Sequence, residues 1–128
     1  HALEPEVVGH MDVIGKFAPA DVPLDTPPIR RAAERALAAM REHDCILDVN
    51  CSRIRLGLNV IYPAPWLLEL ATGEYGLGVC FGDDSHKPSH VGGGILEARE
   101  YLLRHGVGEL AILNRRAGSI VRETAPLE

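Results

Sequence analysis

The chain has 128 residues, of which 46% are hydrophobic and 24% charged, and its formal net charge is −5 at pH 7. This length suits one domain and is too short for two sizeable ones. The apolar content excludes a chain that is disordered throughout, and no apolar run approaches the roughly 20 residues of a membrane-spanning helix. The acidic balance disfavours general binding to nucleic acid or to anionic membranes, so neither partner is expected.

The cysteines and the first residues favour a cytoplasmic protein. The three cysteines, Cys45, Cys51 and Cys80, are odd in number and lack the spacing of a zinc finger. Cys45 and Cys80 lie inside apolar runs, which favours buried thiols, with a reactive nucleophile as the alternative. The segment from His1 has no basic stretch followed by an apolar one, so no signal peptide is predicted, and it has no initiator Met.

Short apolar runs that alternate with helical patterns predict the fold class. Strands are expected at Glu6–Val8, Cys45–Val49, Gly78–Phe81 and Glu109–Leu113. Apolar residues three and four positions apart predict helices at Ile29–Met40, Ala64–Ala71 and Val91–Arg104. This alternation is typical of βαβ units, so we predict an α/β fold with a parallel sheet. The Pro-rich segment Ala18–Pro28 is expected to be a long loop, and residues 115–128 a loose polar tail.

Polar clusters follow the first three predicted strands. They are Gly9–Asp12, Asn50–Arg55 and Gly82–Pro88. The carboxyl ends of parallel strands meet at one edge of a sheet, and the loops that build active sites converge there. We therefore expect the functional site at this edge.

Single residues in these clusters allow more than one interpretation. Asp84 and His86 would point the same way on an extended segment, and carboxylate with imidazole suits zinc, manganese or iron. The same constellation also fits a helix N-cap or a turn, for which Asp83 is the better candidate. His10 fits a buried hydrogen-bonded histidine as well as a metal ligand, and Asp12 fits a residue that orients a neighbouring loop or ligand.

The second cluster holds two arginines, Arg53 and Arg55, which are two residues apart. An arginine at a strand end can hold a phosphate in its guanidinium fork, with a surface salt bridge as the alternative. The Gly92–Gly94 segment follows no predicted strand directly. We interpret it as permissive backbone near a helix start rather than as a phosphate loop.

Taken in order, three segments resemble one family. VVGHMDVIGKF, ILDVNCSRIRLGLNVIYPAPWLLELA and GVCFGDDSHKPSHVGGG look like the C-terminal half of a PHP-superfamily histidinol-phosphate phosphatase, and the last is closest to fungal-type members. The resemblance covers roughly Glu4 to Leu113. It implies that residues 1–114 form about half of a distorted seven-unit (β/α) barrel, followed by the tail 115–128.

The resemblance also implies an activity and a set of site residues. The reaction is hydrolysis of L-histidinol phosphate to L-histidinol, a late step of histidine biosynthesis, assisted by a divalent metal cluster of zinc, manganese or iron. By carry-over, His10, Asp84 and His86 would be metal ligands. Arg55 would contact the substrate phosphate, and Asp84 or a water molecule would assist proton transfer.

Two departures from the family pattern change the expectation. Gly15 stands where such enzymes usually carry a basic residue, so Lys16 is expected to substitute in phosphate binding. The early H-x-H and the bridging Glu of the family have no counterpart. We therefore expect an incomplete chain, inactive by itself, that self-associates or pairs with a complementary N-terminal half, because exposed strand edges invite pairing. Another PHP phosphoesterase or nuclease, and a non-catalytic assembly unit, are the alternatives.

Overall fold

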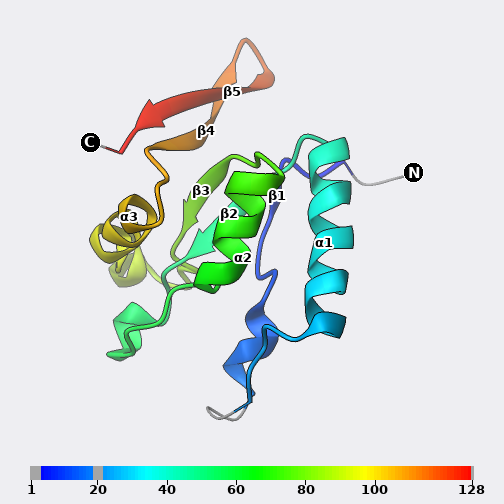
Figure 1. Ribbon diagram of the computed structural model, residues 1–128. Coiled ribbons are helices and arrows are strands. Elements are labelled where there is room, and N and C mark those ends of the chain that lie inside the picture. Colours follow the sequence, from blue (N-terminus) through cyan, green and yellow to red (C-terminus); the bar gives the residue numbers. More distant parts are fainter. Residues whose placement is uncertain (1–3, 19–21, 128) are drawn as a thin grey trace.

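The computed structural model describes residues 4–18 and 22–127. The start at His1 and residues 19–21 of the predicted loop lie outside this range. Three parallel strands form one sheet in the order β1-β2-β3, with β1 at Val7–Val8, β2 at Ile46–Asn50 and β3 at Val79–Gly82. Figure 1 shows β2 between its two neighbours. The α/β class with a parallel sheet is confirmed, and the described residues do not close a barrel.

Three helices accompany the sheet, and each begins where the sequence permits it. They are α1 at Pro27–Glu42, α2 at Pro65–Glu69, which continues as a π-helical turn at Leu70–Glu74, and α3 at Ile95–Arg104. Proline occupies the first turn of α1 and α2, where its missing N–H costs no hydrogen bond. None of the described helices is long and apolar enough to cross a membrane.

The third helix begins later than the sequence pattern predicts. Gly92 and Gly94 both have positive φ, 79° and 88°, which interrupts a helix between Val91 and Ile95. A short 3₁₀ turn at Pro88–His90 stands in that place. The helix therefore starts at Ile95, and the segment before it is free to pack against the end of the sheet.

The core lies between one face of the sheet and the three helices. Leu47 and Val49 of β2 are fully buried there, and they share one apolar cluster with side chains from each helix. The helical members are Leu37, Met40, Leu67, Leu68, Tyr101 and Leu102. Because strand side chains alternate, Asp48 lies on the opposite face of β2. This packing fixes the carboxyl ends of the strands, where the polar clusters begin.

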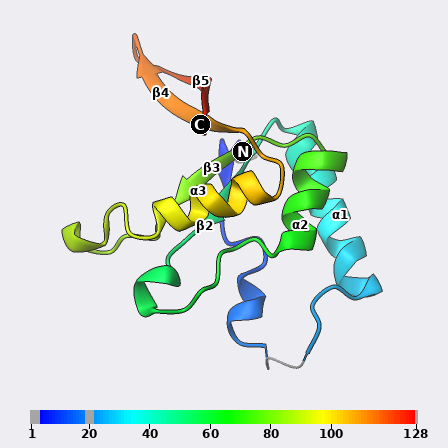
Figure 2. The same cartoon turned by 60° about the vertical axis from the view of Figure 1, so that its left-hand side comes forward.

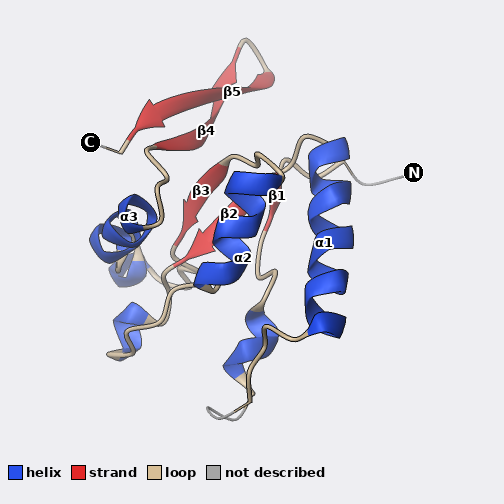
Figure 3. Cartoon of the chain, viewed as in Figure 1, coloured by secondary structure: helices blue, strands red, loops and turns tan. Residues whose placement is uncertain are grey.

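The last part of the chain differs from the prediction. Strand β4 (Glu109–Arg116) pairs antiparallel with β5 (Ser119–Pro126), so the predicted fourth parallel strand and the loose tail are both wrong for the described residues. Ala117 and Gly118 have φ of 49° and 88°, which is the backbone of a tight two-residue hairpin turn. Figures 2 and 3 show this hairpin projecting beyond the sheet and helices.

Candidate active site

A cavity of about 460 Å³ lies beyond the carboxyl ends of β2 and β3, and we call it the strand-end cavity. It is lined by Lys16, Ser52, Arg53, Arg55, Leu56, Asp84, His86, Ser89, His90 and Gly93. Four of the predicted site residues are among them, although they come from three separate segments of the chain. The sheet edge thus brings together side chains that the sequence places up to 70 positions apart.

His10 and Asp84 face each other beside this cavity. His10 Nε2 lies 3.9 Å from Asp84 Oδ1, and both side chains are partly open to solvent. The two residues follow β1 and β3, and both adopt left-handed backbone, with φ of 58° and 51°. Such conformations are uncommon outside glycine and cluster at functional sites, because the surrounding structure must hold them in place.

The predicted extended D-x-H segment is wrong, because a turn occupies this position. The Asp83 carboxylate accepts hydrogen bonds from the Ser85 N–H at 3.1 Å and the Gly92 N–H at 2.7 Å. The Ser85 hydroxyl and then the Gly92 N–H hold the pKa of Asp83 below its usual value by hydrogen bonding to its carboxylate. Asp83 is thus confirmed as the turn residue. Its hydrogen bonds hold the turn in which Asp84 has a left-handed backbone.

His86 is oriented by the same turn. Its Nδ1 lies 2.7 Å from the carbonyl oxygen of Asp84, close enough for an Nδ1–H to donate a hydrogen bond. In that tautomer Nε2 keeps a free lone pair, which is the arrangement of a histidine ready to bind a metal.

Arg55 joins two of the loops. Its guanidinium donates hydrogen bonds to the carbonyl oxygens of Asp83 and Asp84, the second at 3.2 Å. The alternative of a surface salt bridge is therefore not seen for this residue. Its aliphatic stem crosses Gly93, where an added Cβ would lie only 2.7 Å from the Arg55 Cδ.

The Gly92–Gly94 segment has the role that its sequence indicates. A Cβ on Gly94 would lie 2.9 Å from the carbonyl oxygen of Cys51, and the residue has a φ of 88°. The interpretation as permissive backbone is therefore confirmed. These glycines let the segment before α3 pack against the loop that follows β2.

Asp12 lies apart from the strand-end cavity. It is 7% exposed, and its Oδ2 accepts a hydrogen bond of 2.6 Å from the N–H of Ala64, just before α2. Burial raises the pKa of Asp12 above its usual value. The side chain therefore fixes the start of a neighbouring helix, and the expected role of Asp12 in orienting a ligand of the site stays a prediction.

The site contains one acid that sequence reasoning missed. The Asp48 carboxylate lies over Gly82, where any Cβ would overlap it, and its Oδ2 is 3.5 Å from a Cβ built on Gly9. Burial raises the pKa of Asp48, a hydrogen bond with the Asn50 side chain and the charge of His10 lower it, and the charge of Asp84 raises it. The sequence signal that could have found Asp48 is that it is a single acid inside the apolar run of β2. In space, Gly9 and Gly82 lie beside it.

The donor chemistry suits a metal ion, but the ligand set is incomplete. Imidazole and carboxylate are common ligands of zinc and other transition metals, and the His10–Asp84 pair brings one of each together. Within residues 4–18 and 22–127, no three His, Cys, Asp or Glu side chains form a metal-binding group. His10 and Asp84 therefore fit as two members of a larger set.

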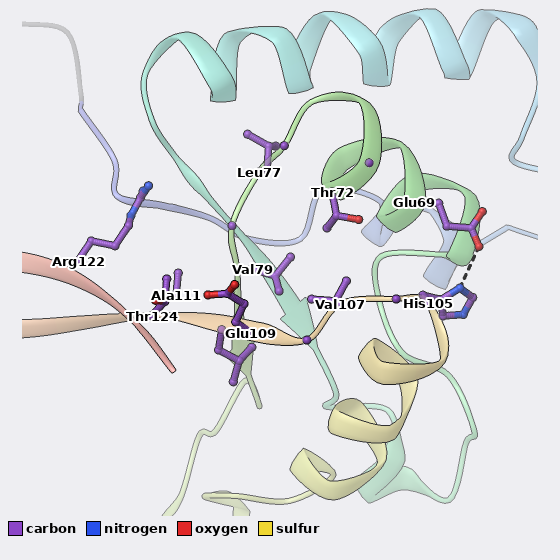
Figure 4. Close-up of a pocket in the computed structure, with 16 residues that line it drawn as sticks. Glu69, Thr72, Leu77, Val79, His105, Val107, Glu109, Ala111, Arg122 and Thr124 are labelled. Atoms are coloured by element: carbon purple, nitrogen blue, oxygen red, sulfur yellow. Dashed lines mark hydrogen bonds and ion pairs between the residues drawn. The ribbon is translucent and has the colours of Figure 1, made fainter. Parts of the chain in front are cut away.

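A larger cavity, of about 610 Å³, lies elsewhere, between the end of α2 and the hairpin. Figure 4 shows Leu77, Val79 and Val107 around it, and the pair of His105 Nδ1 and Glu69 Oε1, 2.9 Å apart, at one side. None of the predicted site residues lines this cavity. The convergence of titratable groups favours the smaller strand-end cavity as the candidate active site.

Comparison with known proteins identifies a relative. Over 116 residues, the chain is 33% identical to a probable histidinol-phosphatase of Schizosaccharomyces pombe. The match covers 88% of this chain and 38% of the relative, so the chain spans well under half of that protein's length. No protein-family model matches the chain. The similarity supports a histidinol-phosphatase-like relationship.

Proposed function

We propose that this protein hydrolyses a phosphate monoester, L-histidinol phosphate, to L-histidinol and inorganic phosphate in histidine biosynthesis. The observation that carries the proposal is the convergence of Lys16, Arg55, Asp84 and His86 on one cavity, next to His10. The name of the relative in Schizosaccharomyces pombe supports the choice of substrate. Cationic side chains suit the phosphate group, and carboxylate with imidazole suits the metal chemistry that hydrolysis uses.

In this proposal Lys16 and Arg55 attract and orient the substrate phosphate. Arg55 uses two N–H groups on the carbonyl oxygens of Asp83 and Asp84, and a guanidinium has further donors for an anion. Water attacks the phosphorus atom, and the bond between phosphorus and the histidinol oxygen breaks. Asp84 takes a proton from the attacking water, and the leaving oxygen receives a proton from protonated Asp84 or from a water molecule.

We further propose that His10 and Asp84 contribute ligands to one divalent zinc, manganese or iron ion, and that His86 contributes a ligand to a neighbouring ion of the same cluster. Divalent ions in such sites lower the pKa of water and neutralise charge on phosphoryl oxygens. The Asp84 carbonyl would fix the tautomer of His86 and leave the Nε2 lone pair free for an ion. A complete site needs ligands in addition to these three.

Phosphate release is the test. A hybrid that joins this chain to the part of the Schizosaccharomyces pombe relative outside the matched region should release phosphate from L-histidinol phosphate when manganese or zinc is added. His86→Ala in that hybrid should lower the rate at least about a hundredfold, because ligand loss removes the ion's contribution. A folded hybrid that releases no phosphate from L-histidinol phosphate, under conditions where the full-length Schizosaccharomyces pombe relative does, would reject the proposed substrate.

A second candidate is a non-catalytic assembly unit. The observation in its favour is that the described part of the chain lacks a group of three metal ligands. Metal analysis of the hybrid separates the two candidates, because an assembly unit would fold and pair without retaining a stoichiometric divalent ion.

A further inference from the structure

Two buried nitrogen atoms in the strand-end cavity have no hydrogen-bond partner. Arg53 Nε and His90 Nδ1 are both inaccessible to water and unpaired, and both residues line this cavity. Buried polar atoms almost always have a partner, so each exception needs an explanation. Among the described residues only one other side-chain atom shares this condition, Asp12 Oδ1, and Asp12 does not line this cavity.

The surroundings of these atoms are positively charged. Lys16, Arg53 and Arg55 line the cavity, and Asp84 is the single acid among its described lining residues. Burial lowers the pKa of His90, and the positive charges of Arg55, Lys87 and His86 lower it further, while Asp83 acts in the opposite direction. An anion in the cavity would meet a favourable field and unpaired donors together.

The two arginines after β2 differ in their contacts. The Arg55 guanidinium is held by two backbone carbonyl oxygens of the neighbouring loop. Arg53 has no such bond on its Nε. A hydrogen bond of 3.0 Å from the Ser52 N–H to Asn50 Oδ1 fixes the loop beside it. Arg55 is therefore engaged in holding the loops together, while the Nε of Arg53 lacks an acceptor.

We propose that Arg53 and His90 also bind the phosphate group of the substrate in the strand-end cavity, in addition to Lys16 and Arg55, and that Arg55 at the same time positions the loop of Asp83 and Asp84. The inference rests on the proposed function for the identity of the anion as a phosphate monoester. The cavity volume of about 460 Å³ is in the range of small-molecule sites, so it accommodates phosphate and a small organic group.

Calorimetric titration of the chain with inorganic phosphate at constant ionic strength tests this proposal. Arg53→Met and His90→Ala should each weaken phosphate binding about tenfold or more, since each removes a hydrogen bond to an anion. Arg35→Met and His43→Ala are matched controls, because both residues are exposed in or next to α1. These controls should bind phosphate as the parent chain does.

Two further measurements keep the test decisive if a variant unfolds. Arg53→Lys keeps the charge but loses the guanidinium N–H groups, so phosphate binding should weaken by a few-fold while the circular dichroism spectrum is unchanged. In the parent chain, the side-chain NMR signals of His90 should shift on addition of phosphate, and those of His43 should not.

Three results would overturn the inference: no saturable phosphate binding by the parent chain, unchanged affinity in folded Arg53→Met and His90→Ala variants, or an unmoved His90 signal. The proposed function is judged separately by turnover. Phosphate binding through Arg53 and His90 without hydrolysis by the hybrid would leave this site standing and reject the enzyme. Hydrolysis by the hybrid at an unchanged rate in both variants would support the enzyme and reject Arg53 and His90 as phosphate ligands.

Discussion

The parallel sheet and the β4–β5 hairpin are stabilised in different ways. In the sheet, Leu47 and Val49 are fully buried, and strands distant in sequence pair beneath helices. In the hairpin, adjacent strands pair through a two-residue turn, and Ile112, Leu113 and Ile120 remain 39%, 37% and 51% exposed. The chemistry-bearing side chains lie on the buried, long-range half, where packing can hold them at fixed positions.

The hairpin is attached to the rest of the molecule through the start of β4, the end of β5 and Arg122. Arg122 donates a hydrogen bond of 2.6 Å to Asp44 Oδ1, and the Leu127 N–H bonds the Gly108 carbonyl oxygen at 2.9 Å. Leu127 is 5% exposed and joins the main core. Local pairing has thus built a regular element whose described residues do not line the strand-end cavity.

The largest expected effect comes from truncating one leucine in each region. Leu47→Ala should lower the free energy of unfolding by about 3 kcal/mol, because it leaves a cavity in the core. Leu113→Ala in the hairpin should cost less than about 1 kcal/mol, since that side chain is already partly exposed. Urea unfolding followed by circular dichroism measures both, and equal losses would contradict the distinction between the regions.

Metal retention is the next test, and it concerns the sheet edge. Asp84→Asn should weaken zinc or manganese binding by about tenfold to a hundredfold, because a carboxylate ligand is lost. Glu97→Gln, an exposed acid in the first turn of α3, is the control of equal charge change and should bind metal normally. Elemental analysis after dialysis gives the answer, and unchanged occupancy in Asp84→Asn would remove Asp84 from the ligand set.

A smaller effect is expected at the hairpin turn. Ala117 has a φ of 49°, a left-handed conformation that costs a residue with a Cβ about 1 kcal/mol. Ala117→Gly should therefore raise the melting temperature by a few degrees, whereas Gly118→Ala should lower it because φ there is 88°. Changes of the opposite sign in thermal unfolding would mean that the turn is built differently.

The smallest effect concerns the Cys80 thiol in β3. Burial, and then the charge of Asp48, raise its pKa from 9.0 to about 11. Between these pH values the folded chain keeps a proton that the unfolded chain releases, so stability should fall as pH rises from 9 to 11. Iodoacetamide should label Cys80 slowly at pH 9 in the folded chain and quickly in urea, as peptide mapping can show.

Sequence reasoning predicted the parts of the molecule that burial dictates. The apolar runs around Leu47 and Val79 are buried as strands of the sheet. The polar residues that follow these strands meet at the edge of the sheet. The β4–β5 hairpin was missed because its turn places Ala117 at positive φ, and the conformational propensity of alanine does not predict that backbone. Asp48 was missed although it is a single acid inside an apolar run, because the glycines and charges that surround it come from other strands. His90 was missed because its neighbours in the cavity come from other loops, and these contacts have no signature in a single sequence.

The contact of the Arg55 side chain with Gly93 affects the rate and the entropy of ligand binding. It holds the loop after β2 to the loop after β3 before any ligand arrives. A site with mobile loops would lose conformational entropy each time a ligand binds. In this protein the loops lose that entropy once, during folding. Association should therefore be governed by diffusion and charge attraction rather than by a slow rearrangement of the loops.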